Sequence, residues 1–267
     1  MTLYTRFDKA RRIIATGFCF SLFGIGGLFL TFILIPLLTF TLKNQQKREL
    51  KAQKIIQQSF FLFCETMRLT GCIDYKIEGG EQLKSDKNCI IVGNHPSLID
   101  YVLLTSQLPQ CDCLVKEALW HNPFLKGVVS AAGYIPNSGP EMLLNECASK
   151  LNDDHVLLIF PEGTRSQKGV SPKLQRGAAQ IAIKTQTDIR VVHVNVTPSF
   201  LTKQAKWYQV PDTKPLFYVQ VKNKIAISDF IDEDTPSIAV RKLNRHLTEI
   251  IFPKMESDEH QGDQHAR

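Results

Sequence analysis

Two residues five positions apart, His95 and Asp100, could together support acid–base chemistry. Residues 90–92 are β-branched and lead to a Gly-Asn pair, which is typical of a strand that ends at a turn. Pro96 suits the first turn of a helix, so the sequence predicts a helix over about 96–107. In one continuous helix, residues five apart point about 140° apart and do not meet. We therefore expect His95 to lie on the turn before the helix and to fold back onto Asp100.

Such a pair has a well-defined chemical use. A carboxylate that binds one ring nitrogen fixes the tautomer of the imidazole and leaves the other nitrogen free as a general base. The simpler interpretation is a histidine that caps the helix and an aspartate on the surface. The pair alone does not decide between the two, because this spacing is common by chance.

A second polar stretch, residues 160–166, follows an apolar segment at 156–160 that has the composition of a buried strand. Ligand sites of α/β proteins lie where such strands end. Glu162 offers a carboxylate, Arg165 a planar fork that suits phosphate, and Gly163 a backbone that a ligand can approach closely. The alternative is a surface turn with a solvated basic face, since three more basic residues follow within about a dozen positions.

The composition is that of a folded protein with a mildly basic surface. The 267 residues are 43% hydrophobic and 22% charged, with a formal net charge of +6. This charge suits anionic lipid headgroups or nucleotide-like ligands, whereas nucleic-acid binding is disfavoured because the basic residues are dispersed and no recognition motif accompanies them. The seven cysteines are scattered and odd in number, which favours a reducing compartment. Cys111 and Cys113 have no second cluster that would complete a metal site.

Residues 13–42 contain no charged side chain and are rich in Phe, Leu and Ile. A membrane-spanning helix needs about 20 such residues, and a cleaved signal peptide has a shorter apolar centre. We therefore predict a membrane anchor rather than a core helix. Basic residues flank the segment on both sides, so the positive-inside rule does not choose between one tilted span and a hairpin that re-emerges on the same face.

A helix predicted over 44–70 has a basic block followed by Ile and Phe residues. It suits a helix at the headgroup level or, equally, an amphipathic helix packed on the rest of the protein. After it, strand-like and helix-like segments alternate, which predicts an α/β domain. We therefore divide the chain into an anchor with an interfacial helix at 1–71, a domain at 72–252, and a polar, disordered tail at 253–267.

The two polar stretches together resemble the motifs of the glycerolipid acyltransferases, whose best-known members are the 1-acylglycerol-3-phosphate acyltransferases. Asn-His-x4-Asp at 94–100 comes first, and Phe-Pro-Glu-Gly-Thr-Arg-Ser follows about sixty residues later at the end of a strand. Supporting matches are Lys116-Glu117, Trp120-x-x-Pro123-Phe124 and Arg176-Gly177-Ala178. The resemblance covers about residues 73–227 and includes the apolar N-terminus. It implies an α/β fold with a mixed sheet flanked by helices, behind a membrane-embedded helical anchor.

By this resemblance, the reaction is transfer of an acyl group from acyl-CoA or acyl carrier protein to a hydroxyl of a lipid. His95 would be the base, Asp100 would orient it, and no acyl-enzyme or metal would be needed. The residues implied to bind the substrate are Lys116, Glu162, Gly163, Thr164 and Arg165. The implied partners are the donor and membrane lipids, without a resident cofactor. In a bacterium, the domain would face the cytosol from the inner membrane, because both donors are cytosolic.

Two departures from the family pattern leave the acceptor open. Gly139 stands where the family's second motif usually has an arginine that holds the phosphate of the acceptor, although Lys116 or Arg165 could still do so. His193 interrupts an apolar strand where the fourth motif usually has a proline. One alternative is thus the same chemistry on another lysolipid, an amino-acid lipid, or a polyketide or aryl lipid. Another is a membrane-tethered lipid-binding protein without catalytic activity.

Overall fold

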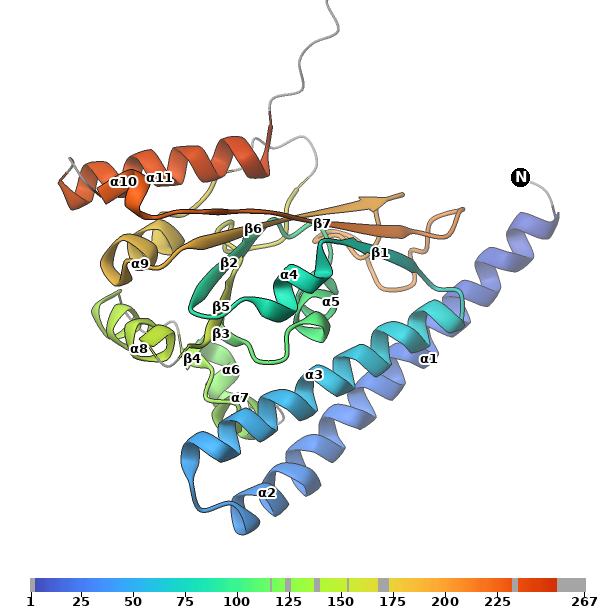
Figure 1. The fold of residues 1–267 in the computed structure, drawn as a ribbon. Coiled ribbons are helices and arrows are strands. Elements are labelled where there is room, and N and C mark those ends of the chain that lie inside the picture. Colours follow the sequence, from blue (N-terminus) through green and yellow to red (C-terminus); the bar gives the residue numbers. More distant parts are fainter. Residues whose placement is uncertain are drawn as a thin grey trace, which may run out of the picture.

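Among the residues that the structure describes, seven strands form one mixed sheet in the order β1-β7-β6-β2-β5-β3-β4 (Figure 1). The structure is a computed structural model and describes residues 3–115, 117–122, 126–136, 140–152, 154–167, 173–231 and 235–253. The strands are β1 (Asp74–Glu78), β2 (Cys89–Gly93), β3 (Asp112–Val115), β4 (Ile135–Pro136), β5 (Val156–Ile159), β6 (Ile189–Thr197) and β7 (Leu216–Ile225). Strands β6, β2, β5, β3 and β4 run parallel to one another, whereas β7 is antiparallel to β6 and parallel to β1. The predicted α/β fold with a mixed sheet is confirmed.

Helices cover both faces of this sheet. Two separate clusters of buried apolar side chains show which helices share a face. One face carries α5 (Asp100–Gln107) and, beyond it, α3 (Gln45–Leu69), while the other carries α8 (Pro140–Asn152), α9 (Gly177–Thr185) and α11 (Pro236–Ile251). The shorter helices are α4 (Gly80–Ser85), α6 (Glu117–His121), α7 (Lys126–Ala131) and α10 (Ser228–Ile231).

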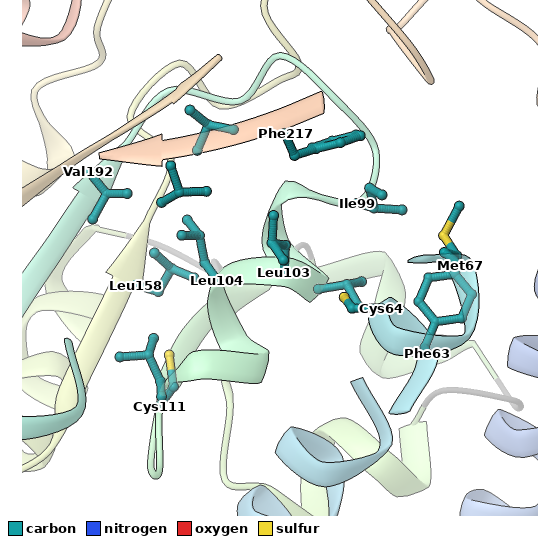
Figure 2. Packing of buried hydrophobic residues seen from close by; sticks show 14 of the residues in the cluster. Phe63, Cys64, Met67, Ile99, Leu103, Leu104, Cys111, Leu158, Val192 and Phe217 are labelled. Atoms are coloured by element: carbon teal, nitrogen blue, oxygen red, sulfur yellow. The ribbon is translucent and has the colours of Figure 1, made fainter. Parts of the chain in front are cut away.

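The core lies on both sides of β2, whose five residues are all buried. A strand that is covered on both faces reads as a continuous apolar run, which is why this segment shows no alternation of polar and apolar residues. In Figure 2, Leu103 and Leu104 of α5 lie between the sheet, seen at Leu158 and Val192, and Phe63 of α3. The α5 helix is therefore held from both sides, and so is the loop that leads into it.

The apolar N-terminal segment turns back on itself. It forms α1 (Leu3–Phe29), a π-helical segment η1 (Leu30–Leu34) and α2 (Ile35–Thr41), after which Asn44 caps α3 by accepting a hydrogen bond from the backbone of Lys47 at 2.9 Å. The α3 helix then returns alongside α1, and Phe23 stacks with Phe60 at 5.9 Å between ring centroids. The stretch Thr5–Thr41 is long and apolar enough to cross a membrane, and only 17% of its most apolar window is buried. Most of this surface therefore lies open on the outside of the helix pair.

A fully buried arginine fastens the start of α1 to the domain. The guanidinium of Arg12 donates to the carboxylate of Asp8 at 2.9 Å, to the carbonyl of Asp212 at 2.7 Å and to the carbonyl of Thr213 at 3.2 Å. Buried charges need such complete pairing, because an unpaired charge is costly in a low-dielectric interior. The beginning of α1 thus lies against the segment that joins β6 to β7.

Three predicted helices have different bounds in the structure. The helix expected from residue 96 begins at Asp100, because the backbone before it bonds elsewhere: Ser97 N donates to the Asp100 carboxylate and Leu98 N to the carbonyl of Leu201. The sequence also predicts a helix near 174–185, which begins at Gly177 in the structure, and one near 117–132, where the described residues contain α6 and α7. The predicted tail lies outside the described residues from 254 onward.

Candidate active site

The two motifs meet at the carboxyl ends of neighbouring parallel strands. β2 lies between β5 and β6, so the loops that follow these three strands share one edge of the sheet. The chain leaves β2 through α5 on one face and leaves β5 through α9 on the other. The diverging loops leave a crevice between them, and open α/β sheets bind ligands at such switch points.

Asn94 fixes the loop after β2, a role that the sequence analysis did not find. Its buried side chain donates to the carbonyl of Val194 at 2.8 Å and accepts from the backbone N–H of Val194 at 2.7 Å. The amide thereby acts like one more backbone pair between β2 and β6. The position of the next residue, His95, follows from this anchorage.

His95 and Asp100 make the predicted contact. His95 Nδ1 lies 3.2 Å from Asp100 Oδ2, and the same oxygen accepts from the backbone N–H of Ser97 at 2.5 Å. The side chain of Asp100 is fully buried, whereas that of His95 is 19% exposed. The alternative of a capping histidine and a surface aspartate is therefore wrong: the histidine lies five residues before the first residue of α5, and the aspartate is inside the protein.

The carboxylate of Asp100 is only partly satisfied. Its Oδ1 is buried without a hydrogen-bond partner among the described residues. Burial raises the pKa of the Asp100 carboxyl, and the hydrogen bonds from His95 and Ser97 oppose this shift without cancelling it. The hydrogen bond from the imidazole therefore favours the charged form of Asp100, against the effect of burial.

Phe160, at the end of β5, holds the imidazole from the side. Its ring stacks on that of His95 with centroids 4.4 Å apart and planes 24° apart. Together with the Asp100 hydrogen bond, this contact restricts both the rotation and the tilt of the imidazole. The sequence shows an aromatic residue just before Pro-Glu-Gly, but nothing in its spacing indicates the stacking.

Glu162 binds the backbone of the loop after β2, which carries His95 and is called the histidine loop below. Its Oε1 accepts from His95 N at 2.9 Å and from the hydroxyl of Ser166 at 2.8 Å, and Ser166 N in turn donates to the carbonyl of His95 at 2.8 Å. These bonds join the loop after β5 to the loop after β2. The prediction that Glu162 contacts the substrate stays a prediction, and the contacts seen here assign it a positioning role.

Gly163 and Arg165 shape the rest of this loop. Gly163 has φ of +67°, and a Cβ at this position would lie 2.6 Å from the side-chain nitrogen of Gln175, so the turn requires glycine. Arg165 donates from Nη1 to the carbonyls of Leu201 and Thr202, both at 3.0 Å. Arg165 therefore ties the loop after β5 to the loop after β6.

These loops border a cavity of about 590 Å³. His95 and Arg165 line it, together with Thr164 and with Lys203, which the sequence analysis did not consider. Its apolar wall is formed by Leu114, Val115, Leu143, Leu158, Ile159, Phe160, Ala178 and Ile181. The cavity thus combines an imidazole, two cationic side chains and a long apolar surface. Of the other predicted site residues, Lys116 lies outside the described residues, as does Gly139.

Comparisons with known proteins point to one family. The family model described as Acyltransferase matches residues 74–197, the span that holds both motifs. A 1-acyl-sn-glycerol-3-phosphate acyltransferase of Helicobacter pylori is 34% identical over 128 residues, which cover 45% of this chain and 54% of that protein. A putative enzyme of the same name from Caenorhabditis elegans is 26% identical over 166 residues, covering 60% and 57%. The chain thus spans little more than half the length of these two relatives.

Two further similarities cover more of the chain. The human 1-acyl-sn-glycerol-3-phosphate acyltransferase alpha is 23% identical over 202 residues, or 73% of this chain and 69% of that protein. The crystal structure of PlsC, the 1-acyl-sn-glycerophosphate (LPA) acyltransferase of Thermotoga maritima, matches with a TM-score of 0.69, covering 95% of this chain and 100% of that one at 20% identity. At this identity, the structural match concerns the fold, which it confirms.

Proposed function

From the match of residues 74–197 to the Acyltransferase family and from the names of the relatives, we propose that the chain is a glycerolipid acyltransferase, which transfers an acyl group from a thioester to a hydroxyl of a lysophospholipid of the 1-acylglycerol-3-phosphate type. The observation that carries this proposal is the His95–Asp100 pair. Nδ1 of the imidazole binds a buried carboxylate, and the ring lines a cavity that has cationic side chains and an apolar wall. The names of the relatives support the same substrate class.

In this reaction, His95 takes the proton of the attacking hydroxyl. Its Nδ1–H donates to Asp100, so the lone pair of Nε2 is available for the proton while the hydroxyl oxygen bonds to the thioester carbonyl carbon. Collapse of the tetrahedral intermediate breaks the C–S bond and releases a thiolate, which the imidazolium can protonate. The pKa of such a thiol is about 8.5, so its departure needs little acid assistance. No acyl-enzyme is required.

The cavity supports a substrate with a charged head and a long tail. Arg165 and Lys203 supply positive charge on the side of His95, which suits a phosphate group. The apolar side chains from β3, β5, α8 and α9 offer a surface on which an acyl chain loses contact with water. This distribution favours a lysolipid over a small polar alcohol. It also favours a catalyst over the non-catalytic lipid-binding alternative, because a binding protein has no need of a held imidazole.

An assay tests the proposal directly. The purified protein in detergent micelles is given acyl-CoA or acyl carrier protein and a panel of lysolipids, and product formation is followed by mass spectrometry. We expect the highest kcat/KM with lysophosphatidate. Turnover of another lysolipid with none of lysophosphatidate would favour the alternative acceptor class that Gly139 suggests. No transfer to any acceptor from either donor would contradict the proposal.

We further propose that the helix pair lies in one leaflet of a membrane and does not cross it. Arg12 holds the start of α1 against the domain, and α3 returns to pack on α5. Both ends of the hairpin are therefore on the side of the domain, while the outer apolar surface of α1 and α2 is left for lipid. Sided labelling in sealed vesicles should find an N-terminal tag and the domain on the same face. A tag on the opposite face would indicate a span.

A further inference from the structure

A second cavity, of about 430 Å³, lies beside the histidine loop. Asn94 and Pro96, the neighbours of His95 in sequence, line this second cavity, while His95 itself lines the first. Lys203 lines both. The two cavities therefore share the Lys203 side chain, and the residues on either side of His95 line the second one.

The walls of the second cavity are polar but mostly uncharged. Strand β6 contributes four consecutive residues to this wall, His193, Val194, Asn195 and Val196. Val194 and Val196 also pack into the core on the α5 face, so the polar lining from β6 comes from His193 and Asn195. The remaining polar lining comes from Ser166, Gln167, Ser199, Thr202 and Gln204, and the apolar lining includes Val196 and Phe252.

Several of these polar groups are available to a ligand. The side chains of His193, Ser199 and Gln204 have no hydrogen-bond partner among the residues that the structure describes. Burial and the positive charge of Lys222 lower the pKa of His193, so its imidazole is neutral and can donate from one nitrogen and accept at the other. The cavity thus offers neutral donors and acceptors, together with the cation of Lys203 on the side of the histidine loop.

The reaction needs a place for each of two substrates. The first cavity, with Arg165 and its apolar wall, suits a charged lipid. The polar arm of a thioester donor has amide and hydroxyl groups, which bind best to neutral hydrogen-bonding side chains, and a dimethyl group, which suits the contact with Val196 and Phe252. A volume of about 430 Å³ is within the range of roughly 300–1,000 Å³ that is usual for small-molecule sites.

We propose that the second cavity binds the phosphopantetheine arm of the acyl donor and brings the thioester to His95 from the side opposite the lipid acceptor. This inference rests on the acyl transfer proposed above. CoA and acyl carrier protein share this arm, so the cavity would serve either donor. His193 and Asn195 would bind its amides, and Ser199 and Gln204 would complete the hydrogen bonds.

Two substitutions on β6 test the assignment. His193→Leu and Asn195→Leu remove hydrogen-bonding groups at the cavity without touching the catalytic residues. Each should raise the KM for acyl-CoA by about three- to tenfold, the value of one neutral hydrogen bond, while kcat and the KM for the lysolipid stay within about twofold. Asn223→Leu is the matched control, since Asn223 is exposed on β7 and does not line the cavity. It should leave every constant unchanged.

A truncated donor and a second carrier sharpen the test. With acyl-N-acetylcysteamine, which lacks most of the arm, wild type and Asn195→Leu should have the same KM. With acyl carrier protein as donor, a rise in the KM of the two variants like that with acyl-CoA supports a shared site. A rise with only one of the two donors supports the site and identifies that donor as the one it binds. An unchanged KM for both donors overturns the inference. So does a rise in the KM for the lysolipid instead, which would assign the cavity to the acceptor.

Direct binding separates this inference from the proposed function. Calorimetric titration with CoA needs no turnover, and we expect the affinity of Asn195→Leu to be about three- to tenfold below that of wild type. Binding that weakens in this way in a protein without transfer activity would contradict the proposed reaction and leave the CoA subsite in place. Transfer activity together with unweakened CoA binding in both variants would overturn the subsite and leave the reaction in place.

Discussion

Among the residues that the structure describes, two histidine–aspartate pairs lie at opposite edges of the same sheet. His95 and Asp100 lie after the carboxyl end of β2, whereas His155 immediately precedes β5 and Asp112 is the first residue of β3. Both pairs join Nδ1 of the ring to Oδ2 of the carboxylate, at 3.2 Å in the first and 2.5 Å in the second. By residue type alone, either could serve as a base and its orienting carboxylate.

Their surroundings differ in access and in hydrogen bonding. Asp112 Oδ1 accepts from the side chain of Gln53 at 2.9 Å and lies 3.7 Å from the ammonium of Lys150, and the His155 side chain is only 5% exposed. Asp100 Oδ1 has no such partner among the described residues. Both carboxylate oxygens of Asp112 are thus bonded, in a network that links α3 and α8 to the sheet, while Asp100 has one unbonded oxygen and its histidine lines a cavity.

The comparison teaches that the pair of residue types does not make a catalytic site. A histidine can remove a proton only if its second nitrogen is reachable, and in α/β folds the carboxyl edge of the sheet is where loops leave such access. A buried pair whose carboxylate is bonded at both oxygens contributes to folding instead. The predictions below test whether the first pair acts in catalysis and the second in stability.

The largest effect is expected for His95→Ala. Loss of the general base should lower kcat/KM by about 10²- to 10⁴-fold, because Asp100 alone does not reach the substrate. The measurement is steady-state transfer by purified protein. Thermal unfolding followed by tryptophan fluorescence should show a midpoint close to that of wild type, and a variant that keeps wild-type turnover would rule out His95 as the base.

Asp112→Asn should instead lower the stability of the protein and leave its transfer rate nearly unchanged. It removes the carboxylate from a buried network that includes His155 and Lys150, and breaking a buried ion pair costs about 3–5 kcal/mol of the free energy of unfolding. Denaturant titration should detect this loss, while the transfer rate per folded molecule stays within about threefold. If the folded variant were instead inactive, the second pair would have a catalytic role that its burial argues against.

Glu162 allows a smaller test of positioning against binding. Glu162→Ala removes the acceptor for the His95 N–H and should lower kcat by about tenfold, with little change in the KM for the lysolipid. Glu162→Gln keeps a carbonyl oxygen in place and should recover most of this loss. A rise in KM in both variants would show instead that the carboxylate contacts the substrate.

The smallest effect is a pH-dependent change in stability at Asp100. Because burial raises the pKa of this carboxyl in the folded protein, its ionisation disfavours folding as the pH rises through the folded pKa. The neutral amide of Asp100→Asn carries no such penalty. The free energy of unfolding of Asp100→Asn relative to wild type should therefore increase from pH 4 to pH 7, measured by denaturant titration, although activity is lost. A difference that is independent of pH would contradict the raised pKa.

Much of the fold could be predicted because the apolar pattern determines it. The continuous run at β2 and the buried run at β5 both indicated strands that the structure contains. The start of α5 was predicted four residues too early, since Pro96 is typical of a first helical turn and no local signal shows that the Leu98 N–H binds the carbonyl of Leu201. Bonds between distant segments decide such boundaries.

The candidate site was predicted in part for the same reason. His95 and Asp100 are near each other in sequence, so their contact followed from helix geometry. The amide of Asn94 on β6, the stacking of Phe160 and the position of Lys203 depend on which strands are neighbours in the sheet. No local sequence pattern determines the order of the strands, so the roles of these residues could only be found from the structure.

The buried guanidinium near the start of α1 has a mechanical consequence. Arg12 binds the carbonyls of Asp212 and Thr213, in the same segment between β6 and β7 that carries Lys203 and Leu201, the residue to which Arg165 is bonded. Any tilt of α1 relative to the sheet must break these bonds or move that segment as well. Lipid that fixes the position of α1 would thus also fix the position of the segment that carries Leu201 and Lys203 beside the first cavity.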